Sequence, residues 1–436
     1  MEEPRAVRFG SSYRPRQSLP GPAHQSTTWK PMETPMRSTR LLHAAPSLVA
    51  AGILIWTTSD AVQARQPAPD FGEPLDRITM DEWSRFFAGR EEFEAVEDAG
   101  DGLGPTFNGR SCAGCHGVPA VGGSAPINET RAQRVVGGVH SELPGGSLFQ
   151  SDAISPDCAE TVPPEANVVA LRQSTPLFGS GLIEAIPDRS ILARARWQAR
   201  THPQQAGRVH VVTDVASGRR RAGRFGWKSQ QATLLSFAAD AYVNEMGITS
   251  RLFPVENAPN GDLARLATCD ATPDPEDEED DFVAFADFMR LLAPPPGADG
   301  RFDRPGRGRG DRDRDRSPGR RLFDQVGCVV CHYDGYQARS SVRAINGRRV
   351  EAFSDFLLHD VGTGDGIVQG GARANELRTA PLWGLKESAP YLHDGSAPTI
   401  EEAIRRHGNQ GAAARDAFDG LSQFDKERLL DFLESI

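Results

Sequence analysis

The sequence predicts a mostly α-helical fold in two similar halves, with long loops and little β-strand. A five-residue pattern, Cys-x-x-Cys-His, occurs once in each half, at residues 112–116 and 328–332. Each half also ends in a segment whose apolar residues recur at the spacing of an amphipathic helix. Glycine-rich stretches between these segments are typical of loops. A chain of 436 residues is long enough for two domains, so we expect one domain around each motif.

The repeated pattern is the attachment signature of c-type haem. The two thiols of each motif would bond to the vinyl groups of the haem, and the histidine would be the proximal iron ligand. The attachment residues are Cys112, Cys115, His116, Cys328, Cys331 and His332. Structural zinc is the alternative, because paired Cys-x-x-Cys motifs form Cys₄ sites. The wide separation of the pairs, and the histidine after each, favour two covalently bound haem c groups.

The N-terminal part of the sequence indicates export. The apolar run Leu48–Trp56 follows two arginines, is too short to span a bilayer and precedes a small-residue cleavage pattern. We interpret Met36–Ala64 as a signal peptide cleaved after Ala64, and residues 1–35 as a disordered extension or the result of an upstream start. An uncleaved anchor is the alternative. The sequence thus predicts a periplasmic protein without stable membrane insertion.

The net charge argues against nucleic acids as partners, and the cysteine content predicts one disulfide. A formal net charge of −10 argues against a nucleic-acid partner and suggests an electron-donor protein with a basic surface. Cys158 and Cys269 remain outside the haem motifs. In an oxidising compartment we expect them to form a disulfide, with two buried free thiols as the alternative.

Composition divides the chain into an N-terminal domain, residues 65–293, a charged linker, residues 294–318, and a C-terminal domain, residues 319–436. The linker contains a proline-rich turn and a run of alternating Asp, Arg and Gly that cannot bury a core. A second charged run, Asp274–Asp281, is interpreted as a solvated loop.

Helical periodicity and capping residues define the expected elements. In each half the terminal helix is expected to pack on the helix that precedes the haem motif, as in cytochrome c-like domains. An element of the form Arg…Pro-Leu-aromatic-Gly also recurs, at residues 172–179 and 378–384. One segment, Val209–Asp214, has the character of a strand. Helices are expected at Asp81–Ala95, Ser229–Met246 and Phe282–Leu292, and from the N-cap Ser422 onward.

Several longer motifs make a family resemblance specific. Gly-Leu-Gly-Pro-Thr-Phe-Asn at residues 102–108 leads into the first haem motif, and Arg-Phe-Gly-Trp-Lys follows at 224–228. The second half has Asp-Phe-Leu-Leu-His-Asp-Val-Gly at 355–362 and Tyr-Leu-His-Asp-Gly at 391–395. Residues 70–436 resemble the bacterial diheme c-type oxidoreductases, described as diheme peroxidases or thiol oxidoreductases, and more distantly the diheme cytochrome c peroxidases. The resemblance implies two cytochrome c-like domains, each around one covalent haem.

The resemblance implies that the C-terminal haem is a six-coordinate electron-transfer centre. The position that matches its distal ligand is His407. This agrees with the methionine content, because the last methionine, Met289, precedes the second motif. His359 is a rival ligand, and His393 matches a position in the haem environment. His407 as a surface or capping residue is the alternative.

The same resemblance implies that the N-terminal haem is the reaction centre, with His116 as its proximal ligand. Glu184 is then a candidate distal acid/base for peroxide, with a solvated or ion-paired glutamate as the alternative. Trp227 is a candidate electron relay between the haems, or else a core tryptophan. The residues that could instead cap the first iron are His140, His202, His210 and Met246.

These expectations combine into a function. We predict an exported enzyme that reduces hydrogen peroxide at the N-terminal haem, with electrons from a small redox protein relayed through the C-terminal haem. A non-catalytic electron carrier with both irons bis-ligated is the alternative, and peroxide-driven oxidation of a protein partner is a third possibility. The resemblance also implies a Ca²⁺ ion held by backbone carbonyls near Ser388, Ala389 and Pro390.

Overall fold

The computed structural model of the protein describes residues 69–270, 272–298 and 317–436. All of them belong to one compact unit, Arg65–Ile436. The predicted N-terminal extension, the predicted signal peptide and most of the predicted charged linker lie outside the described residues. Within the described part of the chain, no helix is long and apolar enough to cross a membrane.

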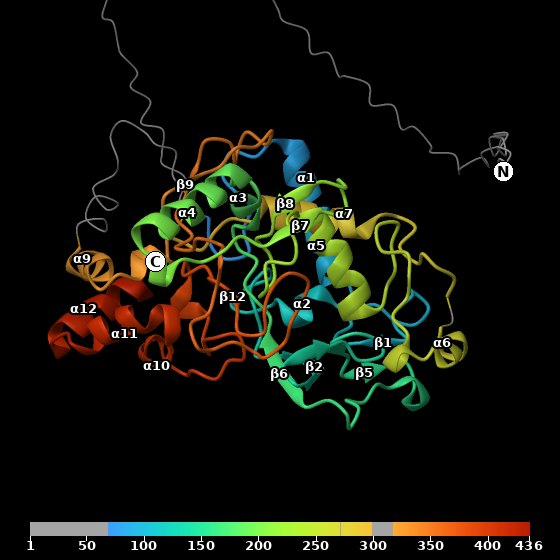
Figure 1. Ribbon diagram of the computed structural model, residues 1–436. Coiled ribbons are helices and arrows are strands. Elements are labelled where there is room, and N and C mark those ends of the chain that lie inside the picture. The colour runs from blue at the N-terminus through green and yellow to red at the C-terminus, as the bar shows by residue number, and fades with distance from the viewer. Residues whose placement is uncertain (1–68, 271, 299–316) are drawn as a thin grey trace, which may run out of the picture. The chain divides into compact units, whose positions relative to one another are not determined.

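Helices are the longest elements of the described chain (Figure 1). Three of the predicted helices correspond closely to α1, α7 and α12, and the fourth, at Ser229–Met246, contains the shorter α5. The α-helices are α1 Met80–Glu94, α2 Cys112–Cys115, α3 Ser180–Glu184, α4 Asp188–Thr201, α5 Leu234–Ala241, α6 Leu263–Cys269, α7 Asp281–Leu291, α9 Pro318–Gln325, α10 Ile400–Arg405, α11 Ala412–Asp419 and α12 Gln423–Glu434.

The strands are short apart from β2 and β6, and they form small antiparallel sheets. In the largest sheet, β2 pairs with β3, β4 and β6. The strands are β1 Thr106–Phe107, β2 Asn128–Val136, β3 Val139–Ser141, β4 Leu148–Phe149, β5 Asp152–Ala153, β6 Val168–Gln173, β7 Val211–Thr213, β8 Arg220–Ala222, β9 Tyr336–Gln337, β10 Arg349–Val350, β11 Leu358–His359 and β12 Leu377–Arg378.

The β2–β6 sheet corrects the prediction of a single strand-like segment. That segment contains β7, but the sequence also folds into the longer β2 and β6. Strand β2, Asn-Glu-Thr-Arg-Ala-Gln-Arg-Val-Val, lacks the alternation of apolar and polar residues that marks a half-buried strand. Its partly buried residues include the charged Glu129 and Arg131, which line a cavity and not the apolar core.

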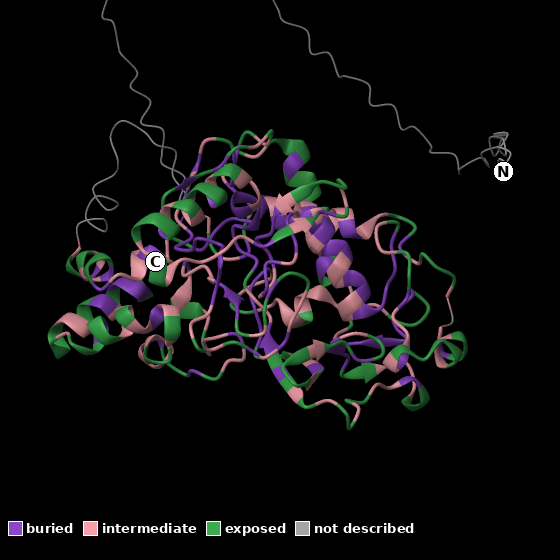
Figure 2. Cartoon of the chain, viewed as in Figure 1, coloured by how far each residue is buried: buried purple, intermediate pink, exposed green. Residues whose placement is uncertain are grey.

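Each half packs its terminal helix on the helix before its motif, as predicted. Helix α7 packs on α1, and α12 packs on α9. At both crossings a glycine lets the backbones approach: a Cβ at Gly89 of α1 would overlap the carbonyl oxygen of Ala284, and a Cβ at Gly319 of α9 would overlap that of Arg428. No residue of α5 or α7 is exposed, and both helices are coloured as buried or intermediate in Figure 2.

The repeated Pro-Leu-aromatic-Gly elements occupy equivalent places in the two halves. Gly179 has φ 71° and its N–H donates to Ala293 O at 3.1 Å, just beyond α7. Gly384 has φ 69° and its N–H donates to Ile436 O at 2.7 Å, just beyond α12. The Trp383 ring packs against Gly179, where a Cβ would meet it. The two elements therefore contact each other and join the halves.

The structure corrects the start and the end of the predicted helix at Ser229–Met246. Ser229 has φ 52°, and α5 begins only after Thr233, whose hydroxyl accepts from Ser236 N–H at 3.3 Å. Beyond α5 the chain continues as a π-helical turn, η3 Tyr242–Met246. Such turns shift the side-chain register of a helix and are frequent at functional sites.

The acidic run Asp274–Asp281 is more ordered than the solvated loop predicted for it. Asp277 is buried, and its carboxylate accepts from Asp281 N–H at 2.8 Å and from Phe282 N–H at 3.3 Å, which caps α7. The predicted disulfide between Cys158 and Cys269 is present, and it ties α6 to the chain near residue 158.

Charged side chains buried between the halves join them further. Asp365 accepts from Arg172 Nε at 2.8 Å and lies 2.7 Å from Lys228 Nζ, and all three side chains are at most 1% exposed. A buried carboxylate between two cations is stable only while every partner is present. We expect Asp365→Asn to lower the free energy of unfolding by about 3–5 kcal/mol, because two buried cations lose their counter-ion.

Urea unfolding of the haem-loaded protein at neutral pH would measure this loss. The matched control is Glu401→Gln, which removes an exposed ion pair with Arg405 at 2.7 Å and should cost about 0–1 kcal/mol. Equal effects of the two substitutions would contradict the structural role given to Asp365.

Candidate functional site

The first motif, residues 112–116, lines a cavity of about 370 Å³, called here the first cavity. Ser111 caps α2 by accepting from Gly114 N–H at 3.1 Å, which fixes the turn that carries the motif. Both thiols are free. Burial raises the pKa of Cys112 to about 12 and that of Cys115 to about 11. The thiols are therefore neutral groups that face the cavity and not reactive thiolates.

The second motif, residues 328–332, lines a separate cavity of about 280 Å³, called here the second cavity. Its thiols are also free, and burial raises the pKa of Cys328 to about 12. Each motif thus has its own cavity. Among the described residues, no cluster of potential metal ligands combines the two Cys-x-x-Cys pairs, which leaves the zinc alternative without structural support.

Three histidines have the geometry that an iron ligand requires. Each Nδ1 lies within hydrogen-bonding distance of a backbone carbonyl oxygen, and since that oxygen only accepts, Nδ1 carries the proton and Nε2 keeps its lone pair. The pairs are His116 with Gly123 O at 3.0 Å, His332 with Phe353 O at 2.9 Å and His407 with Ala403 O at 2.8 Å. Burial lowers the pKa of all three, for His332 to about 4, so the imidazoles are neutral.

These histidines lie at the cavities where the haem groups are expected. His116 lines the first cavity, and His332 and His407 both line the second. The residues present therefore fit two haems: a pair of thiols and a neutral histidine at each cavity, with a second histidine at the second cavity.

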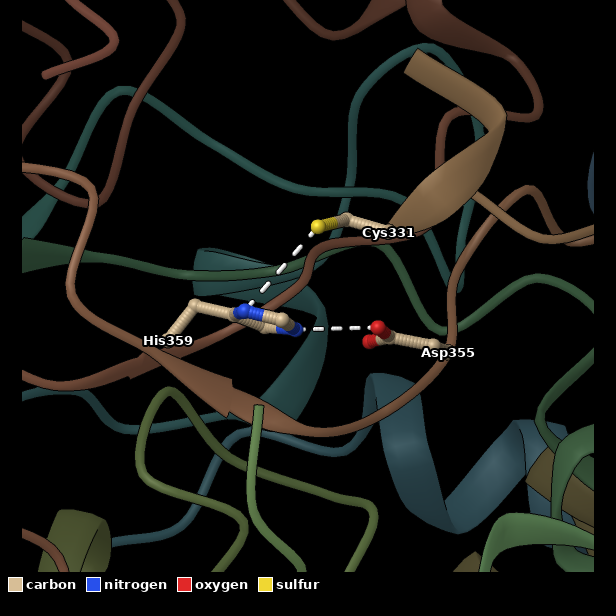
Figure 3. Close-up of side chains that lie close together, drawn as sticks. All are labelled: Cys331, Asp355 and His359. Carbon is tan, nitrogen blue, oxygen red and sulfur yellow. Dashed lines mark hydrogen bonds and ion pairs between the residues drawn. The ribbon is translucent and has the colours of Figure 1, made fainter. Parts of the chain in front are cut away.

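The rival histidines of the second half have their ring nitrogens engaged differently. His359 Nε2 donates to Asp355 at 2.9 Å, and its Nδ1 lies 3.9 Å from Cys331 Sγ (Figure 3). Although burial opposes it, the Asp355 carboxylate raises the pKa of His359 well above its usual value, and a protonated imidazole cannot bind a metal. His393 lines the second cavity, and its ring centroid lies 6.2 Å from that of Trp227.

Of the four residues considered as caps for the first iron, Met246 alone lines the first cavity within the described chain. His210 uses both ring nitrogens elsewhere: Nδ1 donates to Lys228 O at 2.7 Å, and Nε2 accepts from Gly371 N–H at 3.0 Å. His140 lies in β3, and His202 ends α4 with its ring beside Trp197.

Glu184, predicted as the distal acid/base, lies outside the described lining of both cavities. Its carboxylate pairs with Arg290 Nε at 2.9 Å and accepts from Leu234 N–H at 2.8 Å, where it supports the start of α5. This is the ion-paired alternative considered for that residue.

Three carboxylates that the sequence did not indicate line the first cavity instead. One is Asp240 of α5, and the other two, Glu129 on β2 and Glu245 on the π-helical turn η3, lie beside each other. Arg131 forms a bidentate pair with Glu129, at 3.0 and 3.1 Å. Asn108 Nδ2 donates to Glu245 Oε2 at 2.7 Å. The Arg131 and Asn108 side chains line the same cavity.

Glu129 and Glu245 have opposite protonation tendencies. Burial and the nearby Glu129 charge raise the pKa of Glu245 to about 8. Burial opposes it, but the Arg131 guanidinium holds the pKa of Glu129 below its usual value. Burial also raises the pKa of Asp240, to about 6. The first cavity therefore contains one carboxylate that stays ionised, Glu129, and two, Asp240 and Glu245, that exchange a proton near neutral pH.

The sequence contains Glu245 but does not indicate that its side chain lines a cavity. This glutamate lies in the segment Asn244-Glu245-Met246-Gly247, and a regular helix through this segment does not indicate which side chains reach the cavity. The π-helical turn sets that orientation, and no residue pattern in the segment predicts such a turn.

The second cavity has a different chemical character. Within the described residues, no aspartate or glutamate lines it, whereas Arg224, Arg378 and Arg415 do. Arg378 Nε donates to Gly226 O at 2.9 Å, and burial lowers the pKa of this arginine to about 10. A buried guanidinium held by a carbonyl oxygen suits an anionic group in the cavity, such as a haem propionate.

Trp227 lies in the wall shared by the two cavities and lines both. Its indole Nε1 donates to Gln173 O at 2.8 Å, which fixes the ring. The other residues that line both cavities are Gln173, Ser174, Thr175, Leu177, Gly226 and Phe237. The predicted relay residue is thus positioned between the two motifs.

Comparison with known proteins relates the chain to di-haem enzymes. A family model described as "Di-haem oxidoreductase, putative peroxidase" matches residues 165–436, a range that contains Trp227, Glu245 and the second motif. No curated protein matches the chain.

Solved structures give more distant similarities. Hydrazine synthase of Kuenenia stuttgartiensis has 14% identity and a TM-score of 0.38, covering 92% of this chain and 100% of that chain. A MauG-like protein associated with microbial copper homeostasis has 15% identity and a TM-score of 0.35, covering 86% and 94%. The diheme peroxidase BthA of Burkholderia thailandensis has 13% identity and a TM-score of 0.29, covering 69% and 92%.

Proposed function

The chain belongs to the di-haem oxidoreductase family, and on that premise we propose that it reduces hydrogen peroxide at the first cavity with electrons received at the second. The observation that carries this proposal is the chemical difference between the cavities. The first is lined by ionisable carboxylates, while the second is lined by His332 and a second histidine, His407, whose Nδ1 bonds to Ala403 O and whose Nε2 keeps its lone pair. One site is suited to proton-coupled chemistry and the other to electron transfer.

The proposed cofactors are two haem c groups, bonded to the four motif thiols and ligated by His116, His332 and, as the distal ligand of the second iron, His407. When bound, the haem iron of the first cavity supplies the redox chemistry at which the peroxide O–O bond is broken. The overall reaction consumes hydrogen peroxide, two protons and two electrons and yields two water molecules. Calcium at the backbone of Ser388, Ala389 and Pro390 stays a prediction.

Side chains of the first cavity carry out the proton transfers. Glu245, whose pKa is raised to about 8, accepts a proton from one oxygen of the peroxide and returns it to the other oxygen, which departs as water. Asn108 orients Glu245 through its hydrogen bond to Oε2. Burial first and the ionised Glu129 carboxylate second maintain the raised pKa of Glu245, whereas Arg131, which pairs with Glu129, opposes it. These contacts support Glu245, in place of Glu184, as the acid/base.

Electrons would enter at the second cavity and cross the shared wall at Trp227. The indole lines both cavities, which supports a relay role. The acidic net charge of the chain favours a donor protein with a basic surface. An exported protein in the periplasm, with a cleaved signal peptide, agrees with the disulfide between Cys158 and Cys269.

The test is the reaction of the half-reduced, haem-loaded protein with one equivalent of hydrogen peroxide, followed in the Soret region. We expect rapid reoxidation, together with cyanide binding at one haem only. If neither rapid reoxidation nor cyanide binding is observed, the catalytic proposal is wrong, because the first iron would then be closed in that redox state.

The second candidate function is electron transfer without catalysis. Met246 lines the first cavity and offers a thioether that could close the first iron. In that case both haems remain low-spin and six-coordinate in every redox state, and exchange with a redox protein is fast while peroxide turnover is negligible.

A further inference from the structure

Three carboxylates meet in the N-terminal half, away from the lining of both cavities. Glu256, Asp274 and Glu276 each bring a carboxylate oxygen within 4.8 Å of the others. Asp274 and Glu276 belong to the connection between α6 and α7 (Figure 1), and Glu256 precedes α6. Mutual repulsion opposes such a cluster unless a proton or a cation neutralises it.

Glu256 points to a cation because one of its oxygens is buried without a partner. The residue is 7% exposed, and Oε1 accepts from Asn257 N–H at 2.7 Å. Within the part of the chain that the structure describes, Oε2 is buried and has no hydrogen-bond partner. Leaving a buried carboxylate oxygen unsatisfied is costly, and the Glu256 carboxylate that carries this oxygen belongs to the same cluster as the other two carboxylates.

Thr249 holds the other two carboxylates in place. Its N–H donates to Glu276 Oε2 at 2.8 Å, and its hydroxyl contacts Asp274 Oδ1 at 2.8 Å and also Glu276 Oε2. A hydroxyl has one proton, so it cannot donate to both carboxylates at once. The cluster thus has a fixed framework and more acceptors than the described donors can satisfy.

Electrostatics agrees with this geometry. Burial, followed by the charges of Glu276, Asp274 and Asp270, raises the pKa of Glu256 to about 9. Without a cation, stability from this group is full below the unfolded pKa of about 4.3 and is lost as the pH rises toward 9. A bound cation would replace the proton and reverse this dependence.

We propose that Glu256, Asp274 and Glu276 form a binding site for a hard divalent cation, Ca²⁺. An all-oxygen set without histidine or cysteine disfavours zinc and the softer metals. Three protein carboxylates in an irregular frame, one of them exposed and open to water, favour Ca²⁺ over Mg²⁺, which demands near-ideal octahedral geometry. This site differs in residues and place from the one predicted at Ser388–Pro390.

The position of the site gives it a structural role. Gly102, which precedes the first motif, lies directly against the Glu276 side chain, where a Cβ would collide. Thr249 follows the π-helical turn by three residues, and Gly104 N–H donates to Met246 O at 3.0 Å. The cation would therefore hold together the loops that flank the first motif and the turn that carries Glu245.

The test is calorimetric titration of chelator-treated, haem-loaded protein with CaCl₂, compared among four proteins. The unchanged protein is expected to bind Ca²⁺ here with a Kd on the order of 10⁻⁵ M. Glu256→Gln and Asp274→Asn should each weaken this binding by at least about tenfold, because each removes a charged ligand. Asp274 is exposed, so its substitution carries little folding risk. Glu279→Gln, an exposed change in the same acidic run, is the matched control and should bind as the unchanged protein does.

Stoichiometry separates this site from any other calcium site. Loss of one bound equivalent in Glu256→Gln and in Asp274→Asn, but not in Glu279→Gln, supports the proposal. An unaltered stoichiometry and affinity in both variants overturns it, even if calcium binds elsewhere. Equal binding of Mg²⁺ and Ca²⁺, or preference for Zn²⁺, would overturn the assignment to calcium.

Thermal unfolding provides a second readout that does not depend on peroxide turnover. Without Ca²⁺, Glu256→Gln should unfold at the same or a higher temperature than the unchanged protein, because it removes an unsatisfied buried carboxylate. With 1 mM Ca²⁺ (about 100-fold above the expected Kd) the order should reverse. If the order of the two unfolding temperatures is the same with and without Ca²⁺, Glu256 is simply held protonated, which contradicts the proposal.

Discussion

Replacing Glu245 by glutamine is expected to lower kcat/KM for hydrogen peroxide by about 10²–10⁴-fold, the range of general acid–base catalysis. Glutamine preserves the shape of the side chain and can still bond to Asn108, but it cannot accept a proton. Steady-state peroxide reduction with a small reduced donor protein would measure the loss. The absorption spectrum should be unchanged, since Glu245 is not a proposed iron ligand.

The pH profile gives this prediction a second readout. The acid/base must be ionised to accept a proton from peroxide, so kcat/KM should rise with pH through the raised pKa of Glu245, about 8, and level off above it. Glu245→Gln should abolish this limb of the profile. A profile that is unchanged in the variant would assign the titration to another group.

Glu184→Gln is the matched control for this experiment. The substitution disrupts an ion pair with Arg290 outside the described lining of both cavities, so it should alter stability more than turnover. Peroxide reduction within a few-fold of the unchanged protein is expected. A large loss in Glu184→Gln with little loss in Glu245→Gln would reverse the assignment made here.

Replacing His407 by glycine is expected to convert the second haem from a six-coordinate low-spin centre to an open one. The Nδ1 hydrogen bond to Ala403 O fixes this imidazole with Nε2 available, and its removal leaves the second iron without that ligand. Electron paramagnetic resonance of the oxidised protein should show one additional high-spin haem. Cyanide should then bind at two irons.

His359→Gln is the control for the second haem. His359 donates Nε2–H to Asp355, so its loss should leave the second haem low-spin. His407→Met offers a further comparison, because a thioether ligand favours ferrous iron and should raise the midpoint potential of this haem. A low-spin second haem in His407→Gly would exclude His407 as the ligand.

Much of the framework was predictable because local patterns determine it. The haem motifs specify their own chemistry, and helices such as α1 begin at capping residues that a sequence displays: Thr79 and Glu82 form a capping box. The pairing of each terminal helix with the helix before its motif was expected from the resemblance to cytochrome c-like domains, and the structure has it in both halves.

The features that were missed depend on long-range contacts. Glu129 and Arg131 lie on β2, which pairs with β6, and their charged side chains line the first cavity. Asp365 is buried only because Arg172 and Lys228 approach from the other half. In neither case do apolar and polar residues alternate in a pattern that sequence analysis could detect.

The candidate site likewise combines features that the sequence indicates with features that only the fold reveals. His407 was indicated by the family resemblance, and the absence of methionine after the second motif agreed with it. The hydrogen bond that distinguishes its ring from that of His359 is a property of the fold. Glu184 resembled an acid/base by its place in a repeated element, but Arg290 from α7 pairs with it, and no local pattern reveals that partner.

The burial of the motif thiols has a consequence for how the protein is made. Once the fold is closed, the thiols of Cys112 and Cys328 have pKa values of about 12, so almost none is present as the nucleophilic thiolate. Covalent attachment of haem would therefore have to occur while the chain around each motif is still open. In both halves the terminal helix follows its motif in the chain, so biosynthesis from the N-terminus presents the thiols first and the helix that completes each half later.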